Sequence, residues 1–297
     1  MPNIFVNFKI DSTQKISTFL SQKLGLPNSH IQRLFDANKI RIERKVVKDK
    51  KMFYKGSIEV LLFVPHSKGC KPIFVTKDFT VFDKPPQLHT HPKRLYNDYT
   101  LLDEIRFYGG VLANPAHRLD RETFGLLLCG KNLATTKELK DLFLHQRVKK
   151  TYHAVVHGKI DKAFTIDAPI ARVQEYTQTK HKVRVALDGK RAITDVFPIF
   201  YSKKNDTTIV ALTPRTGRTH QLRVHMFHVE HPIVGDPLYG TSYNFADRYL
   251  DGKVTQDERV KTLGSANLQL CAKTLEFTLQ NRYKIFSMLH VEHRYWS

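Results

Sequence analysis

Two prolines, Pro65 and Pro72, bracket the feature that most constrains how this chain can fold. No hydrophobic periodicity of a helix or strand crosses the stretch between them, which is typical of a linker. The linker divides the 297 residues into a short N-terminal and a long C-terminal part. We therefore expect a small domain at residues 1–66, a linker at 67–72 and a larger domain at 73–297.

The N-terminal part begins with a predicted helix. Ile16, Phe19, Leu20 and Leu24 recur at helical spacing, and Gly25 favours a helix end there. The pattern predicts a first helix that ends near Gly25, in a small unit that we place at residues 12–64.

A second helix is expected directly after the first. Ser29 followed by Gln32 fits a capping box, and Ile31, Leu34 and Phe35 form one apolar stripe. We therefore expect the second helix to begin at the capping residue Ser29.

Short antiparallel strands should complete this unit. Ile40 and Ile42 alternate with charged residues, Val46 and Val47 follow a basic turn, and residues 57–64 are β-rich. The order is two helices followed by strands, so the unit should be a small α+β domain.

Basic side chains are expected on the surface of this unit. Arg33, Lys39, Arg41 and Arg44 do not belong to its apolar stripes. We predict that these four side chains contact the phosphates of a polyanionic partner.

The C-terminal part is predicted to be α+β, because its β-rich segments show no regular strand–helix repeat. We expect a largely antiparallel mixed sheet with flanking helices. The clearest predicted strands are 79–82, 124–129, 152–156 and 208–212, and the predicted helices are 133–143 and 221–227.

The charge of the chain indicates its partner class. Forty-eight Lys and Arg against 28 Asp and Glu give a net charge of +20, which attracts a polyanion such as nucleic acid. There is no apolar run near 18 residues and no secretion signal at the start, so we expect a cytoplasmic protein without a membrane partner. Cys70, Cys129 and Cys271 form no Cys-x-x-Cys pair and should be reduced thiols.

One carboxylate lies in a basic setting just before a predicted strand. In residues 117–125, HRLDRETFG, Asp120 stands between Arg118 and Arg121, which favour its ionised form. A rigid turn at the end of a buried strand can hold a reactive group. On spacing alone, a capping aspartate flanked by solvated arginines is the commoner arrangement.

A second segment is dense in hydrogen-bond donors. Residues 215–225 read RTGRTHQLRVH. If Thr219 or His220 begins a helix, Arg223 lies about one turn in and Arg218 lies at its N-terminus, where both could face a phosphate or a carboxylate. A solvated basic helix is the alternative.

The histidines raise the question of a metal site. His220, His225, His228 and His231 lie close together, and residues 89–91 hold two more. There is no His-Glu-x-x-His order with a Glu placed to activate water, so we expect no metal.

Together these segments resemble the RluA family of pseudouridine synthases. Residues 117–125 match His-Arg-Leu-Asp-x-x-Thr-Ser-Gly, and residues 215–225 match Arg-Thr-Gly-Arg-Thr-His-Gln-Ile-Arg-Val-His except for one Leu. Residues 150–158 match Lys-x-Tyr-x-Ala-x-Val-x-Gly, and residues 231–240 agree further. The resemblance covers about residues 73–280.

Three departures accompany these resemblances. Phe124 replaces a Ser and Gln87 replaces a Gly, which affects loop shape and target choice. The N-terminal order resembles the RNA-binding domain first seen in ribosomal protein S-four, but Glu43 and Arg44 stand where that family usually has an Asn-Gly type turn.

The resemblance implies isomerisation of uridine in RNA without a cofactor. Asp120 would act as nucleophile at the anomeric carbon or as base at the neighbouring carbon, two roles that the sequence leaves open. Tyr152 would stack on the loosened base and help to remove the proton from carbon five. Arg223 would pair with the catalytic carboxylate.

The remaining site residues would bind RNA. Arg118 would fill the gap left by the extruded uridine, Arg218 would contact the RNA, and His220 and Gln221 would support the site. We expect ribosomal RNA as the substrate, with transfer RNA as the alternative, no DNA partner and a monomer. Two rival functions are a non-catalytic RNA-binding protein and a hydrolase of free nucleosides; the basic charge disfavours the second.

Overall fold

The structure is a computed structural model that describes residues 3–92, 98–173 and 183–292. It forms two compact units. The first comprises residues 1–68 and 92–99, and the second comprises 69–91 and 100–297. The domain boundaries expected from the sequence, with a linker at residues 67–72, stay a prediction, and residues 93–97 lie outside the described residues.

The N-terminal unit packs two helices against a four-stranded antiparallel sheet. Ile16, Leu20, Ile31 and Phe35 lie on the helices and are buried against sheet residues such as Ile58. The elements are β1 (Asn3–Lys15), α1 (Ile16–Leu24), α2 (Asn28–Asp36), β2 (Ile40–Ile42), β3 (Lys45–Val46) and β4 (Phe53–Phe63), with the strand order β1-β4-β2-β3.

Both helices of this unit were predicted, but the start of the second was wrong. Helix α1 ends before Gly25, whose φ of 62° is left-handed, as expected. Helix α2 begins at Asn28, and Pro27 takes the capping position without a side-chain hydrogen bond. The extended backbone of Pro27 lets its carbonyl accept from the N–H groups of His30 and Ile31. Ser29 therefore lies inside the helix, and the predicted capping box does not form.

Strand β1 was not predicted, although it is the longest strand of the unit. It pairs with β4 along its length, and the register shifts between Ile10 and Gln14. The β2–β3 hairpin was predicted. Its turn residues Glu43 and Arg44 have φ values of 47° and 65°, so they adopt the left-handed conformation for which Asn and Gly are usually chosen.

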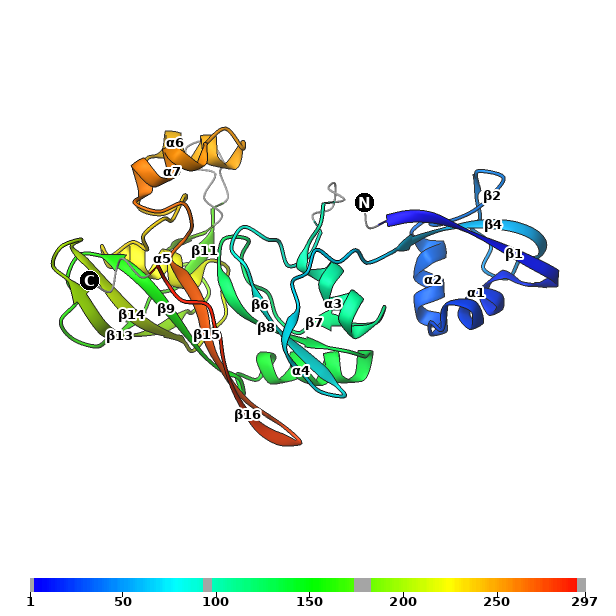
Figure 1. The fold of residues 1–297 in the computed structure, drawn as a ribbon, viewed down its shortest axis with the longest axis horizontal. Helices are drawn as coiled ribbons and strands as arrows, with labels where there is room; N and C mark the ends of the chain where they lie inside the picture. Colours follow the sequence, from blue (N-terminus) through cyan, green and yellow to red (C-terminus); the bar gives the residue numbers. More distant parts are fainter. Residues whose placement is uncertain (1–2, 93–97, 174–182, 293–297) are drawn as a thin grey trace. The chain divides into compact units, whose positions relative to one another are not determined.

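The C-terminal unit is built on a ten-stranded mixed sheet (Figure 1). Its main path has the order β10-β13-β14-β9-β15-β8-β6-β5, with β16 beside β15 and β7 beside β8. Among the described strands, β8 and β15 pair in parallel and the other pairs of this sheet are antiparallel. The strands are β5 (Pro72–Val75), β6 (Phe79–Lys84), β7 (Asn114–Pro115), β8 (Phe124–Gly130), β9 (Lys149–His157), β10 (Phe164–Asp167), β13 (Ile193–Ser202), β14 (Thr207–Pro214), β15 (Leu270–Leu279) and β16 (Asn281–Phe286); β11 (Ile170–Arg172) and β12 (Val183–Val185) form a separate pair.

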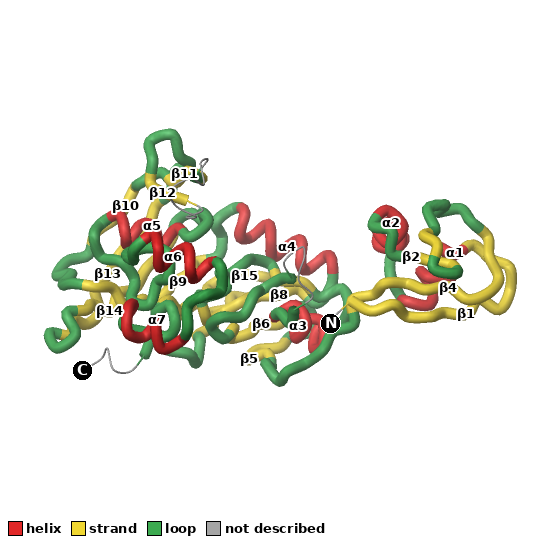
Figure 2. The backbone as a smooth tube through the Cα atoms, turned by 90° about the horizontal axis from the view of Figure 1, so that it is seen from above, coloured by secondary structure: helices red, strands yellow, loops and turns green. Residues whose placement is uncertain are grey.

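The α+β prediction is therefore confirmed for this unit, as are its two predicted helices, α4 (Leu133–Leu144) and α5 (Gln221–His228). Three further helices were not predicted: α3 (Leu101–Gly109), α6 (Tyr243–Leu250) and α7 (Gln256–Leu263) (Figure 2). Figure 1 shows α6 and α7 standing out from the sheet, and an ion pair between Arg248 and Glu258 joins the two helices. No helix in the described ranges is long and apolar enough to cross a membrane.

Strand β8 is the rigid element next to the aspartate motif. All seven of its residues are buried, with β15 on one side and β6 on the other. Gly125 has a φ of 102°, and a Cβ there would lie 2.4 Å from the carbonyl oxygen of Ala272. This close approach requires a glycine. It fixes the start of β8, which directly follows the loop that contains Asp120.

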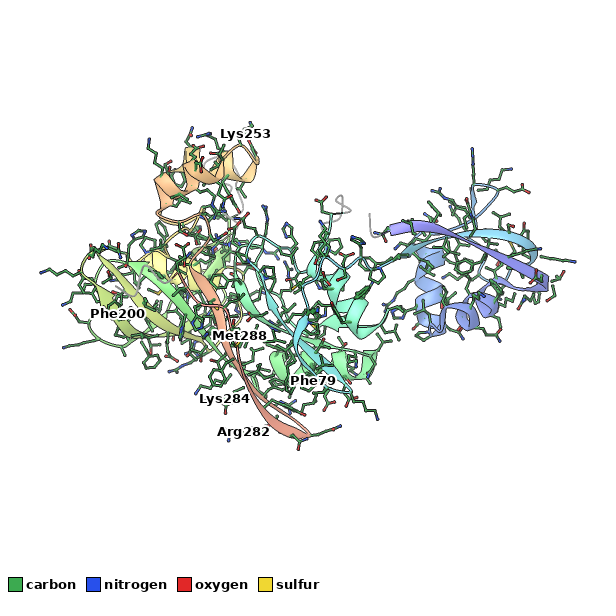
Figure 3. The ribbon with its side chains drawn as sticks, viewed as in Figure 1. Phe79, Phe200, Lys253, Arg282, Lys284 and Met288 are labelled. Atoms are coloured by element: carbon green, nitrogen blue, oxygen red, sulfur yellow. The ribbon has the colours of Figure 1, made fainter. Side chains whose placement is uncertain are left out.

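Charged side chains occupy the periphery of this unit. Figure 3 shows Arg282 and Lys284 pointing away from the β16 hairpin, and Lys253 at the outer end of the α6–α7 pair. All three side chains are exposed. They belong to a solvated surface rather than to the core.

Candidate active site

A pocket of about 940 Å³ lies beside the N-terminal end of β8. Its walls come from the loop before β8, the end of α4, the start of β9 and residues 213–223. Among the described lining residues, Asp120 is the only carboxylate. The cationic lining side chains are Arg118, Lys140, Lys149, Lys150, Arg215, Arg218 and Arg223. The pocket is therefore suited to a polyanion that carries a group toward Asp120.

Asp120 is contacted by an arginine and a histidine of the second motif. Its Oδ2 lies 3.6 Å from Nη1 of Arg223 and 3.7 Å from Nε2 of His220. Its side chain is 31% exposed, so it stays accessible from the pocket. The sequence suggested that the flanking arginines would support its charge, but Arg121 donates to the carbonyl of Gln87. Within the described chain, Asp120 instead forms an ion pair with Arg223 and contacts the ring of His220.

Arg223 is held mainly by a carboxylate that the sequence analysis did not single out. Its Nε and Nη2 donate to the two oxygens of Asp236, both at 2.7 Å. Asp236 also accepts from the N–H groups of Leu238 and Tyr239. Burial opposes the charge of Arg223, but Asp236 and then Asp120 outweigh it and raise its pKa. The predicted pairing of Arg223 with Asp120 is thus the longer of two contacts.

Tyr152 lies in β9 between Leu212 of β14 and Ala272 of β15, and it lines the pocket. Burial, and next the charge of Asp120, raise the pKa of its hydroxyl above the ordinary value. The phenol is therefore neutral at physiological pH, and its ring contributes an apolar face to the pocket.

Lys84 lies beneath the aspartate loop and is fully buried. Its Nζ donates to the carbonyls of Pro85 and Leu88, at 2.9 and 2.8 Å, and to that of Arg121 at 3.1 Å. Burial lowers its pKa to about 7, against the nearby charges of Glu122 and Asp120. Lys84 thus ties the peptide that follows Asp120 to the end of β6.

His117 fixes the other end of the same loop. Its Nε2 accepts from the N–H of Leu128 at 3.1 Å, and its ring stacks on Phe143 at 4.3 Å. Burial, and then the charge of Lys150, lower its pKa to about 3. A neutral ring is needed because the nitrogen serves as an acceptor.

The other predicted RNA-binding residues of this unit have different surroundings. Arg118 and Arg218 are exposed and line the pocket. His220 contacts the Tyr239 hydroxyl at 3.0 Å as well as Asp120. Gln221 is buried: its Oε1 accepts from Thr216 and from the N–H of Arg218, and its Nε2 donates to β13. Gln221 therefore holds the loop together, and its contribution to RNA binding stays a prediction.

The predicted basic residues of the N-terminal unit are on its surface to different degrees. Arg33 and Arg44 are exposed, and Lys39 is half-buried. Arg41 lies with its guanidinium 4.2 Å from the ring centroid of Phe5. Arg41 is thus packed on an aromatic ring, whereas Arg33 and Arg44 extend into solvent.

The clustered histidines have separate partners. His225 is buried between Thr194 and the carbonyl of Ala168, and His231 contacts the carbonyl of His157. The described residues contain no group of three or more His, Cys, Asp or Glu side chains that could hold a metal ion.

The two departures from the RluA pattern are accommodated locally. Phe124 is buried against Val155 and Ile209. Gln87 has a φ of 59°, the conformation that a glycine would adopt without cost, and its side chain donates to Asn267 at 2.8 Å. Both substitutions gain packing or a hydrogen bond and leave the pocket's charged groups in place.

Comparisons with known proteins agree with this geometry. Residues 78–228 match the family described as RNA pseudouridylate synthase, and this segment includes Asp120, Tyr152 and Arg223. A Helicobacter pylori protein called an uncharacterized RNA pseudouridine synthase is 38% identical over 270 residues, which are 91% of this chain and 90% of that protein. The chain therefore belongs to the RNA pseudouridylate synthase family and is an isomerase that acts on RNA.

Two further similarities support this assignment. The ribosomal large subunit pseudouridine synthase D of Pseudomonas aeruginosa is 36% identical over 173 residues, 57% of this chain and 52% of that protein. The solved structure of human RNA pseudouridylate synthase domain containing 1 covers 75% of this chain and 84% of its own, with a TM-score of 0.58 and 26% identity. The named synthase D relative supports the resemblance to the RluA family.

Proposed function

We propose that this enzyme converts a specific uridine of large-subunit ribosomal RNA to pseudouridine, with Asp120 as the reacting carboxylate. The observation that carries the assignment is that Asp120 is the one described carboxylate in a pocket lined by seven Lys and Arg side chains. The choice of ribosomal RNA is supported by the similarity to ribosomal large subunit synthase D. The basic lining favours RNA over a free nucleoside.

Asp120 has the chemistry that glycosidic bond cleavage requires. A carboxylate next to the ribose can attack the anomeric carbon or remove a proton from the neighbouring carbon, and either path breaks the bond between the anomeric carbon and the uracil nitrogen, which detaches the base from the ribose. The base then turns and rejoins through carbon five. Arg223 and His220, at 3.6 and 3.7 Å, keep Asp120 directed into the pocket.

Tyr152 is suited to handle the detached base. Its ring lies on the pocket wall, where it can stack on the uracil, and its neutral hydroxyl can take part in proton transfer from carbon five. Arg118 is exposed at the same pocket and can occupy the gap that the extruded nucleotide leaves in the RNA.

The N-terminal unit supplies affinity in this proposal. Its order of two helices and a basic hairpin supports an S-four-type RNA-binding domain, and Arg33 and Arg44 are exposed for phosphate contacts. The residues proposed for the reaction all lie in the C-terminal unit, so the two roles are separable by mutation.

Pseudouridine mapping tests this function. Ribosomal RNA from cells with the gene should contain at least one pseudouridine that is missing from cells without it. The wild-type gene should restore that site, whereas a gene that encodes Asp120→Asn should not. Identical pseudouridine maps of ribosomal RNA would contradict the ribosomal substrate, and a loss confined to transfer RNA would reassign it.

A further inference from the structure

A buried ion pair lies directly behind the aspartate loop. Glu122, two residues after Asp120, is 4% exposed, and its Oε2 accepts from Nη2 of Arg259 in α7 at 2.9 Å. Its other oxygen accepts from the hydroxyl of Tyr249 in α6. The α6–α7 pair is therefore fastened to the loop that displays Asp120.

The same arginine reaches the segment that holds Arg223. Nη2 of Arg259 also donates to the carbonyl of Gly235 at 3.3 Å, and the next residue is Asp236, the bidentate partner of Arg223. The Gly235 backbone is itself tightly enclosed, since a Cβ there would lie 2.1 Å from the carbonyl oxygen of Asn267. Movement of Arg259 would thus be transmitted to Asp236.

These contacts close a ring around the two reacting partners. From Asp120 the backbone leads to Glu122, the ion pair leads to Arg259, and a hydrogen bond leads to Gly235. The backbone then leads to Asp236, whose ion pair with Arg223 returns to Asp120 through the 3.6 Å contact. Two side chains of this ring join the Asp120 loop to the Asp236 segment: Arg223, through the two aspartates themselves, and Arg259, through Glu122 and the carbonyl of Gly235.

We propose that Arg259 is a positioning residue, which sets the separation of Asp120 and Arg223 by joining Glu122 to Gly235. This inference rests on the roles proposed for Asp120 and Arg223. It gives the α6–α7 pair a function in the reaction, although Figure 1 shows the pair outside the sheet and Figure 3 shows its outer end with Lys253 in solvent.

The test replaces the ion pair without leaving a buried charge. In the double variant Glu122→Gln/Arg259→Met both charges are removed together, so the fold should be retained. We expect its kcat on the substrate RNA to fall by about tenfold to a hundredfold, because small displacements of reacting groups are costly. KM and RNA affinity should stay within about twofold, since the RNA-facing side chains are unchanged. Arg259→Lys keeps the charge and should recover part of the loss.

The matched control is Arg248→Met, which breaks the Arg248–Glu258 pair between the same two helices on their exposed side. This variant should keep the wild-type kcat. A folded double variant with wild-type kcat, or one with raised KM alone, would overturn the proposal. If the double variant does not fold, wild-type kcat of Arg259→Lys would overturn it and a lowered kcat would support it. Turnover by Asp120→Asn would instead show that the proposed function had failed.

Discussion

Asp236 and Asp120 face the same guanidinium from two different segments, and their environments differ sharply. Asp236 is fully buried and contacts Arg223 through two hydrogen bonds of 2.7 Å. Asp120 is 31% exposed and lies 3.6 Å from Arg223. Both are carboxylates beside one cation, so burial and contact geometry decide how each can act.

This difference suits Asp236 to holding Arg223 in place and Asp120 to reacting with a substrate. Asp236 uses its oxygens on Arg223 and on two backbone N–H groups, which leaves it no free direction toward a substrate. Asp120 remains accessible from the pocket and is still close enough to Arg223 to be stabilised by its positive charge. A fixed arginine can thus orient a reactive carboxylate without saturating it.

The largest effect on stability is expected from Asp236→Asn. This substitution removes the bidentate counter-charge of the buried Arg223 and leaves it only the longer contact with Asp120, so the free energy of unfolding should fall by about 3–5 kcal/mol. Urea denaturation would measure the change. Asp195→Asn is the matched control, because Asp195 makes a bidentate contact with an exposed arginine, Arg215; it should cost about 1 kcal/mol or less. Equal losses for the two variants would show that Asp236 has no special holding role.

The sequence predicted those site residues that lie within a contiguous motif. Asp120 and Arg223 were found because each lies in a motif with a specific resemblance. Asp236 lies in the fourth matched stretch, residues 231–240, but its ion pair with Arg223 depends on how this stretch packs against α5, which the spacing does not reveal. Arg259 lies in no matched motif, and the role proposed for it depends on its contact with Glu122 in the loop before β8, which only the structure reveals.

The fold was predictable to a similar extent. Continuous apolar runs such as β8 were identified, and so was the antiparallel, mixed character of the sheet. Strand β1, which is held by its pairing with β4, was not identified. Helices α3, α6 and α7 were also missed, although Thr100, Ser242 and Thr255 precede them as N-cap residues that can be read from the sequence. The capping error at Ser29 arose because Pro27 could begin the helix without a side-chain cap.

A smaller, pH-dependent effect on the free energy of unfolding is expected from substitution of His117, which fixes one end of the Asp120 loop. Burial lowers its folded-state pKa to about 3 from an ordinary 6.5, so the unfolded state binds more protons between these values. The stabilisation is complete above pH 6.5 and is lost as pH falls, by up to about 1.4 kcal/mol per pH unit. Urea denaturation of the wild type and His117→Gln should give a stability difference that is constant from pH 7 to 8 and shrinks toward pH 5. A difference independent of pH would contradict a buried neutral His117.

The smallest effect, on RNA affinity and its dependence on salt, is expected from substitutions of the exposed arginines of the N-terminal unit. Arg33→Ala and Arg44→Ala should each reduce the slope of log affinity against log salt by up to about 0.9, because each removes one phosphate contact. Filter-binding titrations would measure the slope, and kcat at saturating RNA should be unchanged. Arg282→Ala on the β16 hairpin is the control and should not alter the slope. Unchanged slopes in all three variants would make the N-terminal basic surface a solvated one.

Single-turnover kinetics of Asp120→Asn, measured with RNA affinity on the same substrate, test the central claim most directly. The substitution keeps the size of the side chain and removes only its reactive charge. We predict a rate lower by about a thousandfold or more, with affinity within a few fold of the wild type. A variant that forms pseudouridine at a rate near the wild type would show that Asp120 is not the reacting carboxylate.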